Sequence, residues 1–220
     1  MIVTKIERQK RDPHRFSIYL DGEFALGVHA NVLVKFGLRK GDDLDSEAIK
    51  SIQSTEELSL ARRKALQLIN YRMRTEKELR TKLMEKEFNP EVITIAIEQL
   101  RSMGIVDDEK FARAYVHDAH LRKPAGRRLL LQQLRLKGVQ AQIIQQVLDE
   151  QTNATGEKEL ALQAAKKIMK RIRLSRRRIA VEKQQQRVAQ FLARRGFGWD
   201  TISPVIRKLF KNSSVDERDT

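Results

Sequence analysis

Lysine and arginine side chains carry the strongest chemical signal in this chain, and most of them lie in its second half. The net charge is +15. Residues 1–58 hold 9 Lys+Arg against 10 Asp+Glu, whereas residues 151–210 hold 15 against 4. A positive charge that rises along the chain is typical of a surface that meets a polyanion. A basic protein with solvated helix faces would have the same composition.

Two acid-free runs contain many of these cations: residues 119–148 and the segment AAKKIMKRIRLSRRR. Cations in the second run step by three and four residues, so they share a helix face and repel one another. A phosphate backbone or an acidic protein surface would relieve that repulsion. The candidate polyanion-binding residues are Arg122, Arg127, Arg128, Arg135, Lys137, Lys166, Lys167, Lys170, Arg171, Arg173, Arg176, Arg177 and Arg178.

Other chemistry-bearing residues favour structural explanations. His117 and His120 share a helix face and could hold a metal with a carboxylate, but a pair of surface histidines is the favoured interpretation. Asp107-Asp108-Glu109 could be nuclease ligands, yet acids in a first helical turn complement the helix dipole. The chain has no cysteine, and no phosphate-binding glycine motif is present. We therefore expect no enzyme activity, no metal site and no cofactor.

The first part of the chain is predicted to be β-rich. Period-2 alternation of apolar residues flanks Asp21-Gly22, which indicates a hairpin. Residues 2–9 add a third strand, and Ala30–Phe36 forms a short helix that ends at Gly37. No secretory signal and no membrane span is visible, so we expect a cytoplasmic protein without membrane contact.

From Ser54 onward the pattern predicts helices. Capping boxes are indicated at Ser54 and Thr75, and further helix starts at Asn89-Pro90 and Asp107. Leading helices are expected at about 55–70, 107–122 and 157–173.

A glycine turn recurs within this helical part. Gly138 aligns with Gly196, and Glu87 takes the same place in an earlier copy. Before each turn, two apolar residues four positions apart (two leucines, or a valine and a leucine) share a helix face. After each turn, apolar residues at i, i+1, i+4 and i+5 do the same, so each copy presents one apolar face. A left-handed residue ends one helix and the next helix begins after a tight turn. Glutamate costs roughly 1 kcal/mol in that conformation, so the first turn is expected to differ in detail.

The sequence therefore predicts a mainly α fold: three tandem three-helix repeats in an elongated, curved array after a small β-rich segment. The predicted parts are residues 1–53 (β-rich), 54–106, 107–152 and 153–212 (repeats), and 213–220 (a flexible tail).

Sequence-specific reading of DNA by these helices ranks below a structural role. Gln140, Gln142, Gln145 and Gln146 could contact bases, but the corresponding helix in the first repeat is apolar and acidic. Trp199 could stack on a base, although closing the small core of its repeat is the favoured interpretation.

Four phrases of the helical part resemble the RecX family, bacterial regulators of the RecA recombinase. They are YRMRTEKELRTKL, GIVDDEKFARAYV, GRRLLLQQLRLKGV and LARRGFGWDTI, in the family's order and spacing. The departures are Thr75, where serine is usual, and Glu87, where glycine is usual. The resemblance covers about residues 58–210.

The resemblance implies a non-enzymatic modulator of RecA. Family members bind RecA and its filament on single-stranded DNA, inhibit ATP hydrolysis and strand exchange, and limit filament growth, which places them in DNA repair, recombination and the SOS response. We expect a monomer whose basic helices lie along the filament groove. A general DNA-binding protein that affects RecA indirectly, and a sequence-specific transcription factor, remain as alternatives.

Overall fold

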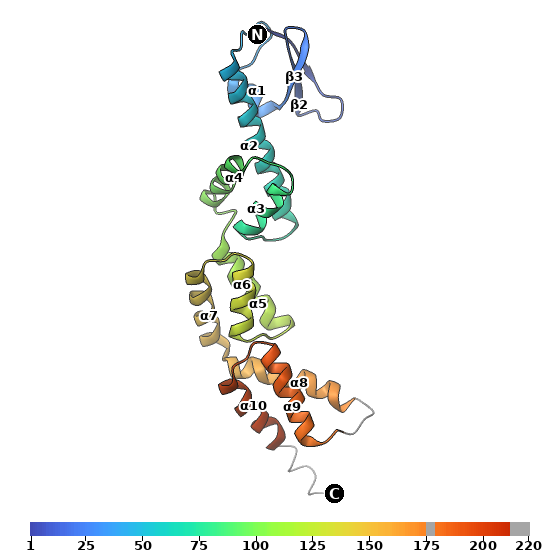
Figure 1. Cartoon of the computed structure of the whole chain (residues 1–220), viewed down its shortest axis with the longest axis vertical. Coiled ribbons are helices and arrows are strands. Elements are labelled where there is room, and N and C mark those ends of the chain that lie inside the picture. Colours follow the sequence, from blue (N-terminus) through green and yellow to red (C-terminus); the bar gives the residue numbers. More distant parts are fainter. Residues whose placement is uncertain (175–178, 212–220) are drawn as a thin grey trace. The chain divides into compact units, whose positions relative to one another are not determined.

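The structure is a computed structural model that describes residues 1–174 and 179–211 (Figure 1). It divides into two compact units, Met1–Val106 and Asp107–Thr220. Its strands are β1 (Val3–Arg8), β2 (Arg15–Leu20) and β3 (Glu23–His29). Its helices are α1 (Ala30–Phe36), α2 (Ser46–Tyr71), α3 (Glu76–Met84), α4 (Pro90–Ser102), α5 (Asp108–Arg122), α6 (Arg127–Leu136), α7 (Ala141–Thr155), α8 (Glu157–Arg173), α9 (Val181–Arg194) and α10 (Trp199–Lys211). Among the described residues, no helix has the length and apolar character needed to cross a membrane.

The strands form one antiparallel sheet in the order β1-β2-β3. Asp21 and Gly22 join β2 to β3 with φ angles of 48° and 93°, the positive values that a tight hairpin turn requires. Helix α1 ends at Gly37, whose φ is 61°. The predicted hairpin, third strand and glycine-terminated helix are therefore confirmed.

A buried carboxylate attaches this sheet to α2. Glu56 is 6% exposed. It accepts a hydrogen bond of 2.7 Å from the backbone N–H of His29 and forms an ion pair of 2.9 Å with Arg15. A buried charge is tolerated only with such partners, so these contacts fix the sheet against the helix.

Helix α2 begins earlier than the sequence pattern predicts. Asp45 is its N-cap and accepts a hydrogen bond of 2.7 Å from the N–H of Ala48. Ser54 lies inside the helix, where its hydroxyl donates to the carbonyl of Lys50, so the predicted capping box at Ser54 is wrong. The preceding turns stay helical because Ile52 is buried in the core beneath the sheet. The predicted boundary between residues 53 and 54 falls within this helix.

The remaining helices form three triplets, α2–α4, α5–α7 and α8–α10, which confirms the three three-helix repeats. The second and third helices of each triplet are joined by a left-handed residue: Glu87 (φ 62°), Gly138 (φ 87°) or Gly196 (φ 82°). In every copy the N–H of the residue after the left-handed one donates a hydrogen bond to a carbonyl of the preceding helix. In the second copy this bond runs from Val139 to Leu134 and is 3.1 Å long. Glu87 therefore adopts the same Schellman-type turn as the glycines, rather than a different one.

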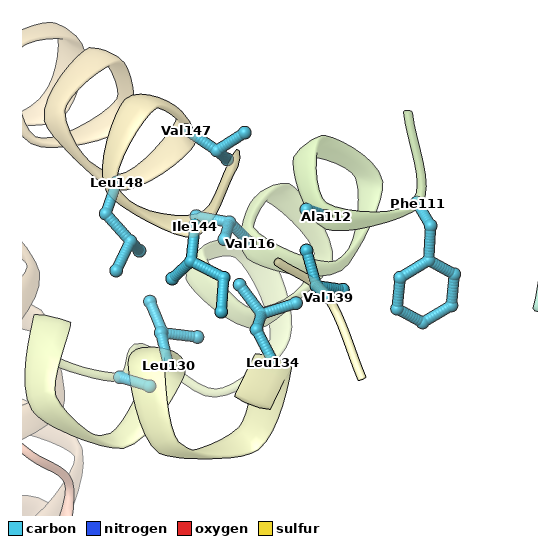
Figure 2. Close-up of a cluster of buried hydrophobic side chains, with 10 residues drawn as sticks. Phe111, Ala112, Val116, Leu130, Leu134, Val139, Ile144, Val147 and Leu148 are labelled. Carbon is cyan, nitrogen blue, oxygen red and sulfur yellow. The ribbon is translucent and has the colours of Figure 1, made fainter. Parts of the chain in front are cut away.

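Each repeat has its own apolar core on the predicted helix faces. In the second repeat, Leu130 and Leu134 of α6 pack against Ile144, Val147 and Leu148 of α7 (Figure 2). All five side chains are at most 1% exposed. The first and third repeats have corresponding clusters, so burial of these faces holds each triplet together.

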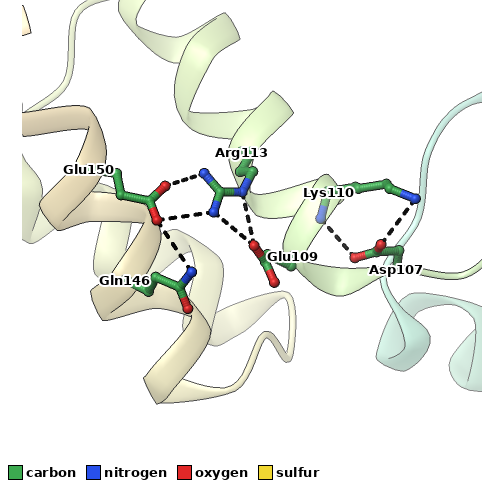
Figure 3. A network of polar contacts seen from close by, with 6 residues as sticks. All are labelled: Asp107, Glu109, Lys110, Arg113, Gln146 and Glu150. Carbon is green, nitrogen blue, oxygen red and sulfur yellow. Dashed lines mark hydrogen bonds and ion pairs between the residues drawn. The ribbon is translucent and has the colours of Figure 1, made fainter. Parts of the chain in front are cut away.

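Charged side chains also join α5 to α7 on the surface of the second repeat (Figure 3). Arg113 donates to Glu109 on its own helix at 2.8 Å and to Glu150 on α7. Gln146 donates to the same Glu150 carboxylate at 3.3 Å. The hydrogen bond from Arg113 is the main reason that the pKa of Glu150 lies below its ordinary value. The charge of Arg113 is therefore neutralised within the repeat.

Replacing Glu87 by glycine is expected to stabilise the first repeat by about 1 kcal/mol, because glycine adopts a positive φ without strain. Glu85→Gly is the control: Glu85 has a φ of −60°, so glycine there relieves no strain. It adds conformational entropy to the unfolded chain and removes the exposed ion pair of 2.6 Å with Lys82. Hydrogen-exchange protection of amides in α3 and α4 measures both changes. Equal protection in the Glu87→Gly variant and the parent would contradict the strain assigned to this turn.

Asp107 is expected to stabilise the start of α5 in a pH-dependent way. Its carboxylate accepts a hydrogen bond of 2.9 Å from the N–H of Lys110, and mainly for this reason its pKa lies below the ordinary value of 3.8. The stabilisation is therefore present above that value and is lost as the pH falls through the folded-state pKa. Asp107→Ala should cost about 1 kcal/mol at neutral pH.

Asp107→Asn keeps the cap without the titrating group and is the matched control. Thermal unfolding of the three proteins between pH 7 and pH 3 measures the effect. The advantage of Asp107 over alanine should shrink with acidification, whereas the advantage of asparagine should not. A constant advantage for both residues would refute the electrostatic contribution.

Candidate nucleic-acid interface

Helix α8 carries more of the candidate cations than any other helix among the described residues. Its first turn has Glu157 and Glu159, and its last turn has Lys170, Arg171 and Arg173, a distribution that complements the helix dipole. Its alanine-rich face is buried in the core of the third repeat. The basic side chains therefore point to solvent along the rest of the helix surface.

The α8 cations line two separate hollows. Lys166, Lys170 and Arg173 line one of about 420 Å³, which also includes Leu209 of α10; we call it the basic groove. The shared helix face predicted for these three cations is thus present. Arg177, predicted to belong to the same face, lies with Arg176 and Arg178 outside the described residues.

Lys167 and Arg171 line the second hollow, of about 280 Å³. Its other walls come from α9 and from the loop after α5, so we call it the junction pocket. Cations from both neighbouring segments complete its rim: Arg122, Lys123 and Arg195. Residues 122 and 123 belong to the second repeat and Arg195 to the third, so the pocket lies where these two repeats meet.

The α8 cations have no ion pair with any described residue. Lys166 and Lys170, like Lys167 and Arg171, are i,i+4 neighbours of equal charge, which destabilises a helix by a few tenths of a kcal/mol per pair. An anionic partner would remove this repulsion and gain charge-assisted hydrogen bonds.

Other predicted binding residues have structural roles. Arg127 forms an ion pair of 2.7 Å with Asp149, and its backbone N–H donates to Glu157 at 2.9 Å, so it joins α6 to α7 and α8. Lys137 lies over the ring of Tyr115 at 5.4 Å from the centroid, a cation–π contact. The candidates Arg122, Arg128 and Arg135 are exposed.

Two glycines determine how this surface is built: Gly196, which the sequence predicts only as a turn residue, and Gly126, for which no role is predicted from the sequence. Gly126 and Gly196 bring the two repeats together backbone to backbone: the N–H of Gly126 donates to the carbonyl of Arg195 at 2.8 Å, and that of Arg128 donates to the carbonyl of Gly196 at 3.2 Å. A Cβ on Gly126 would lie 2.5 Å from the Gly196 carbonyl. Only glycine permits this approach, and Arg195 is held beside it.

The structure corrects the interpretation of Trp199. Its side chain is 66% exposed, so it does not close the core of the third repeat. Phe197, at 2% exposure, fills that place because it directly follows the left-handed glycine and turns inward, while Trp199 begins α10. An exposed tryptophan is compatible with the base-stacking alternative.

The candidate glutamines just before and within α7 give little support to sequence-specific reading. Gln145 accepts a hydrogen bond from Arg127, and Gln146 donates to Glu150 at 3.3 Å. Base recognition needs side chains whose donors and acceptors are free to meet base edges. Two of the four candidate side chains are used within the protein.

Gly126→Ala is expected to disrupt the contact between the second and third repeats. Gly126 has an ordinary φ of −78°, so the whole effect is the clash with backbone, which costs up to about 3 kcal/mol. Gly156→Ala is the control: its φ is 67°, but nothing lies within 4 Å of its added Cβ, so about 1 kcal/mol is expected. Urea unfolding with hydrogen exchange of α6 and α9 measures both. A Gly126→Ala protein as stable as the control would contradict the clash.

Family models match this chain in four consecutive segments. Residues 1–45 match "Regulatory protein RecX N-terminal domain". Residues 61–100, 107–148 and 157–206 match the first, second and third three-helix domains of RecX. These segments include the sheet and most of each of the three repeats.

Individual proteins are similar over nearly the whole chain. "Regulatory protein RecX" of Bacillus subtilis is 33% identical over 218 residues, which are 99% of this chain and 81% of that protein. The protein of the same name from Clostridium perfringens strain 13 is 34% identical over 97% of this chain and 99% of its own. A crystal structure of regulatory protein RecX superposes with a TM-score of 0.73 at 31% identity, covering 93% of this chain and 98% of that one.

Proposed function

The chain belongs to the RecX family, and on that premise we propose that it binds RecA filaments on single-stranded DNA and restrains them. In this proposal it inhibits ATP hydrolysis, filament extension and strand exchange by RecA. It acts by binding, as a monomer in the cytoplasm, and catalyses no reaction. Its role is the regulation of DNA repair and recombination, including the SOS response.

One observation carries the proposal: the cations of α8 lack ion pairs among the described residues, while cations such as Arg113 and Arg127 are neutralised within their own repeat. A RecA filament offers phosphates of its DNA and carboxylates of its subunits, and both suit lysine and arginine. The basic groove, with Lys166, Lys170 and Arg173, is the proposed anchor. Further proposed contacts are the exposed Arg122, Arg128 and Arg135, and the cations that follow α8 in the sequence, Arg176, Arg177 and Arg178.

A general DNA-binding protein is the second candidate, because unpaired cations on a helix contact any phosphate backbone regardless of sequence. Such a protein would affect RecA only by covering the DNA. The two candidates differ in the amount of protein that is needed and in the dependence on salt.

The deciding experiment measures ATP hydrolysis by preformed RecA filaments on single-stranded DNA while this protein is titrated from far below the RecA concentration. Inhibition at a small ratio to RecA would support recognition of the filament. Inhibition only at amounts that coat the DNA would favour the general binder, and no inhibition at any amount would refute the proposal.

Replacing Lys166, Lys170 and Arg173 together by alanine is expected to raise the amount of protein needed for half-inhibition about tenfold or more. Alanine preserves helix propensity, so circular dichroism should be unchanged. The charge-matched control replaces the exposed Lys158, Lys183 and Lys208, which line neither hollow. If both triple variants inhibit equally well, the basic groove is not the anchor.

A further inference from the structure

The junction pocket is lined by mostly exposed cations, which we call its rim, and by buried or half-buried apolar side chains, which we call its floor. Its rim cations come from three segments that are far apart in the sequence: the end of α5, the second half of α8 and the end of α9. They are Arg122, Lys123, Lys167, Arg171 and Arg195, and no described acidic residue lines the pocket. None of the five has an ion pair with a described residue. An anion is therefore the complementary ligand.

Arg195 is the most constrained of these cations. Its guanidinium carbon lies 5.9 Å from the centroid of the Phe191 ring. Its Nε is buried and has no hydrogen-bond partner among the described residues. Buried N–H groups are almost always paired with an acceptor, so the unpaired Nε is unusual. The contact with Phe191 holds this side chain in place while one of its hydrogen-bond donors is unused.

The floor distinguishes the pocket from a simple phosphate site. Pro124, Ala164, Ile168 and Phe191 supply it, and a bare phosphate ion would leave this apolar surface uncovered. A nucleotide has both features, since its phosphate suits the cations and its base and sugar suit the floor. Arg195 lies over one face of the Phe191 ring, and the other face of this ring and the guanidinium plane are surfaces of the kind on which bases stack.

A single strand fits this requirement and a duplex does not. In a duplex the bases are paired and stacked inside, so a base cannot enter a pocket beside its own phosphate without being extruded. In a single strand the bases are free to turn out and stack on protein side chains.

The pocket is also preformed. The carbonyl of Arg195 accepts the hydrogen bond from Gly126, so the contact between the two glycines fixes the end of α9 beside the loop that carries Arg122 and Lys123. Sites built on such fixed backbone need little reorganisation when a ligand binds.

We propose that the junction pocket holds one nucleotide of a single nucleic-acid strand, with its phosphate on the rim cations and its base or sugar against Phe191. The proposal rests on the proposed function, because it specifies which component of a DNA-bound filament this face would meet. It assigns to this pocket a role separate from the phosphate or carboxylate contacts of the basic groove on the other side of α8.

The test uses the full chain and fluorescein-labelled oligothymidylate, with fluorescence anisotropy as the readout. Replacing Lys167 and Arg171 by alanine should weaken binding about tenfold. The slope of log affinity against log salt should fall by about 0.7 for each phosphate of the single strand that the variant no longer neutralises. The control replaces Lys158 and Lys183 in the same unit, and it should change the affinity less than about threefold. Equal weakening in the two variants would overturn the proposal.

A second variant tests the base-binding floor. Phe191→Leu keeps an apolar side chain but removes the ring, so it should weaken binding of oligothymidylate and leave binding of an abasic oligonucleotide of the same length unchanged. The parent protein should prefer oligothymidylate over both the abasic strand and the duplex. Equal binding of the thymidine and abasic strands by the parent would mean a phosphate site only, and would overturn the nucleotide assignment.

Inhibition of RecA, measured in parallel, separates this proposal from the proposed function. If the oligonucleotide results are as expected while the parent does not affect RecA, the pocket assignment stands and the regulatory function fails. If the Lys167 and Arg171 variant loses inhibition but binds oligothymidylate like the parent, the pocket takes an acidic protein surface, and the nucleotide assignment is wrong.

Discussion

The backbone contact between Gly126 and Gly196 is the constraint on which the basic surface of the second unit depends. Neither position has room for a Cβ, because an added carbon would lie 2.5 Å or less from atoms of the other segment. At this point the two repeats meet through main-chain hydrogen bonds, which cannot repack as side chains do. This contact sets the spacing between cations of α5, α8 and α9 that are far apart in the sequence.

The same turn serves two purposes in this fold. In all three copies the left-handed residue ends a helix, and the first copy tolerates a glutamate at a modest cost. At Gly196 the turn also docks against the start of α6, so both a positive φ and the lack of a side chain are needed. Repetition explains the three-helix repeat. The second use of the glycine explains how the second and third repeats form one compact unit.

Sequence periodicity predicted the repeats, their core faces and the N-terminal hairpin, because apolar spacing and turn chemistry are local. Periodicity did not predict the features that contacts between distant segments determine. The start of α2 depends on burial of Ile52 beneath the sheet, and the exposure of Trp199 depends on Phe197 taking the inward position. The ion pair between Arg127 on α6 and Asp149 on α7 shows that Arg127 has a structural role, unlike the exposed cations. No local sequence pattern indicates this pairing.

The distribution of partners among the cations is more informative than their number. In the first two repeats, acids on the same or the facing helix neutralise basic side chains, as Glu76 does for Arg80 at 3.0 Å and Glu109 for Arg113 at 2.8 Å. Helix α8 has no acid after Glu159, so its cations repel one another at i,i+4 spacing. A helix that only needed a solvated face would gain stability from acids at these positions. Their absence means that some of the intrinsic stability of α8 is given up, which an anionic ligand bound to either side of the helix would restore.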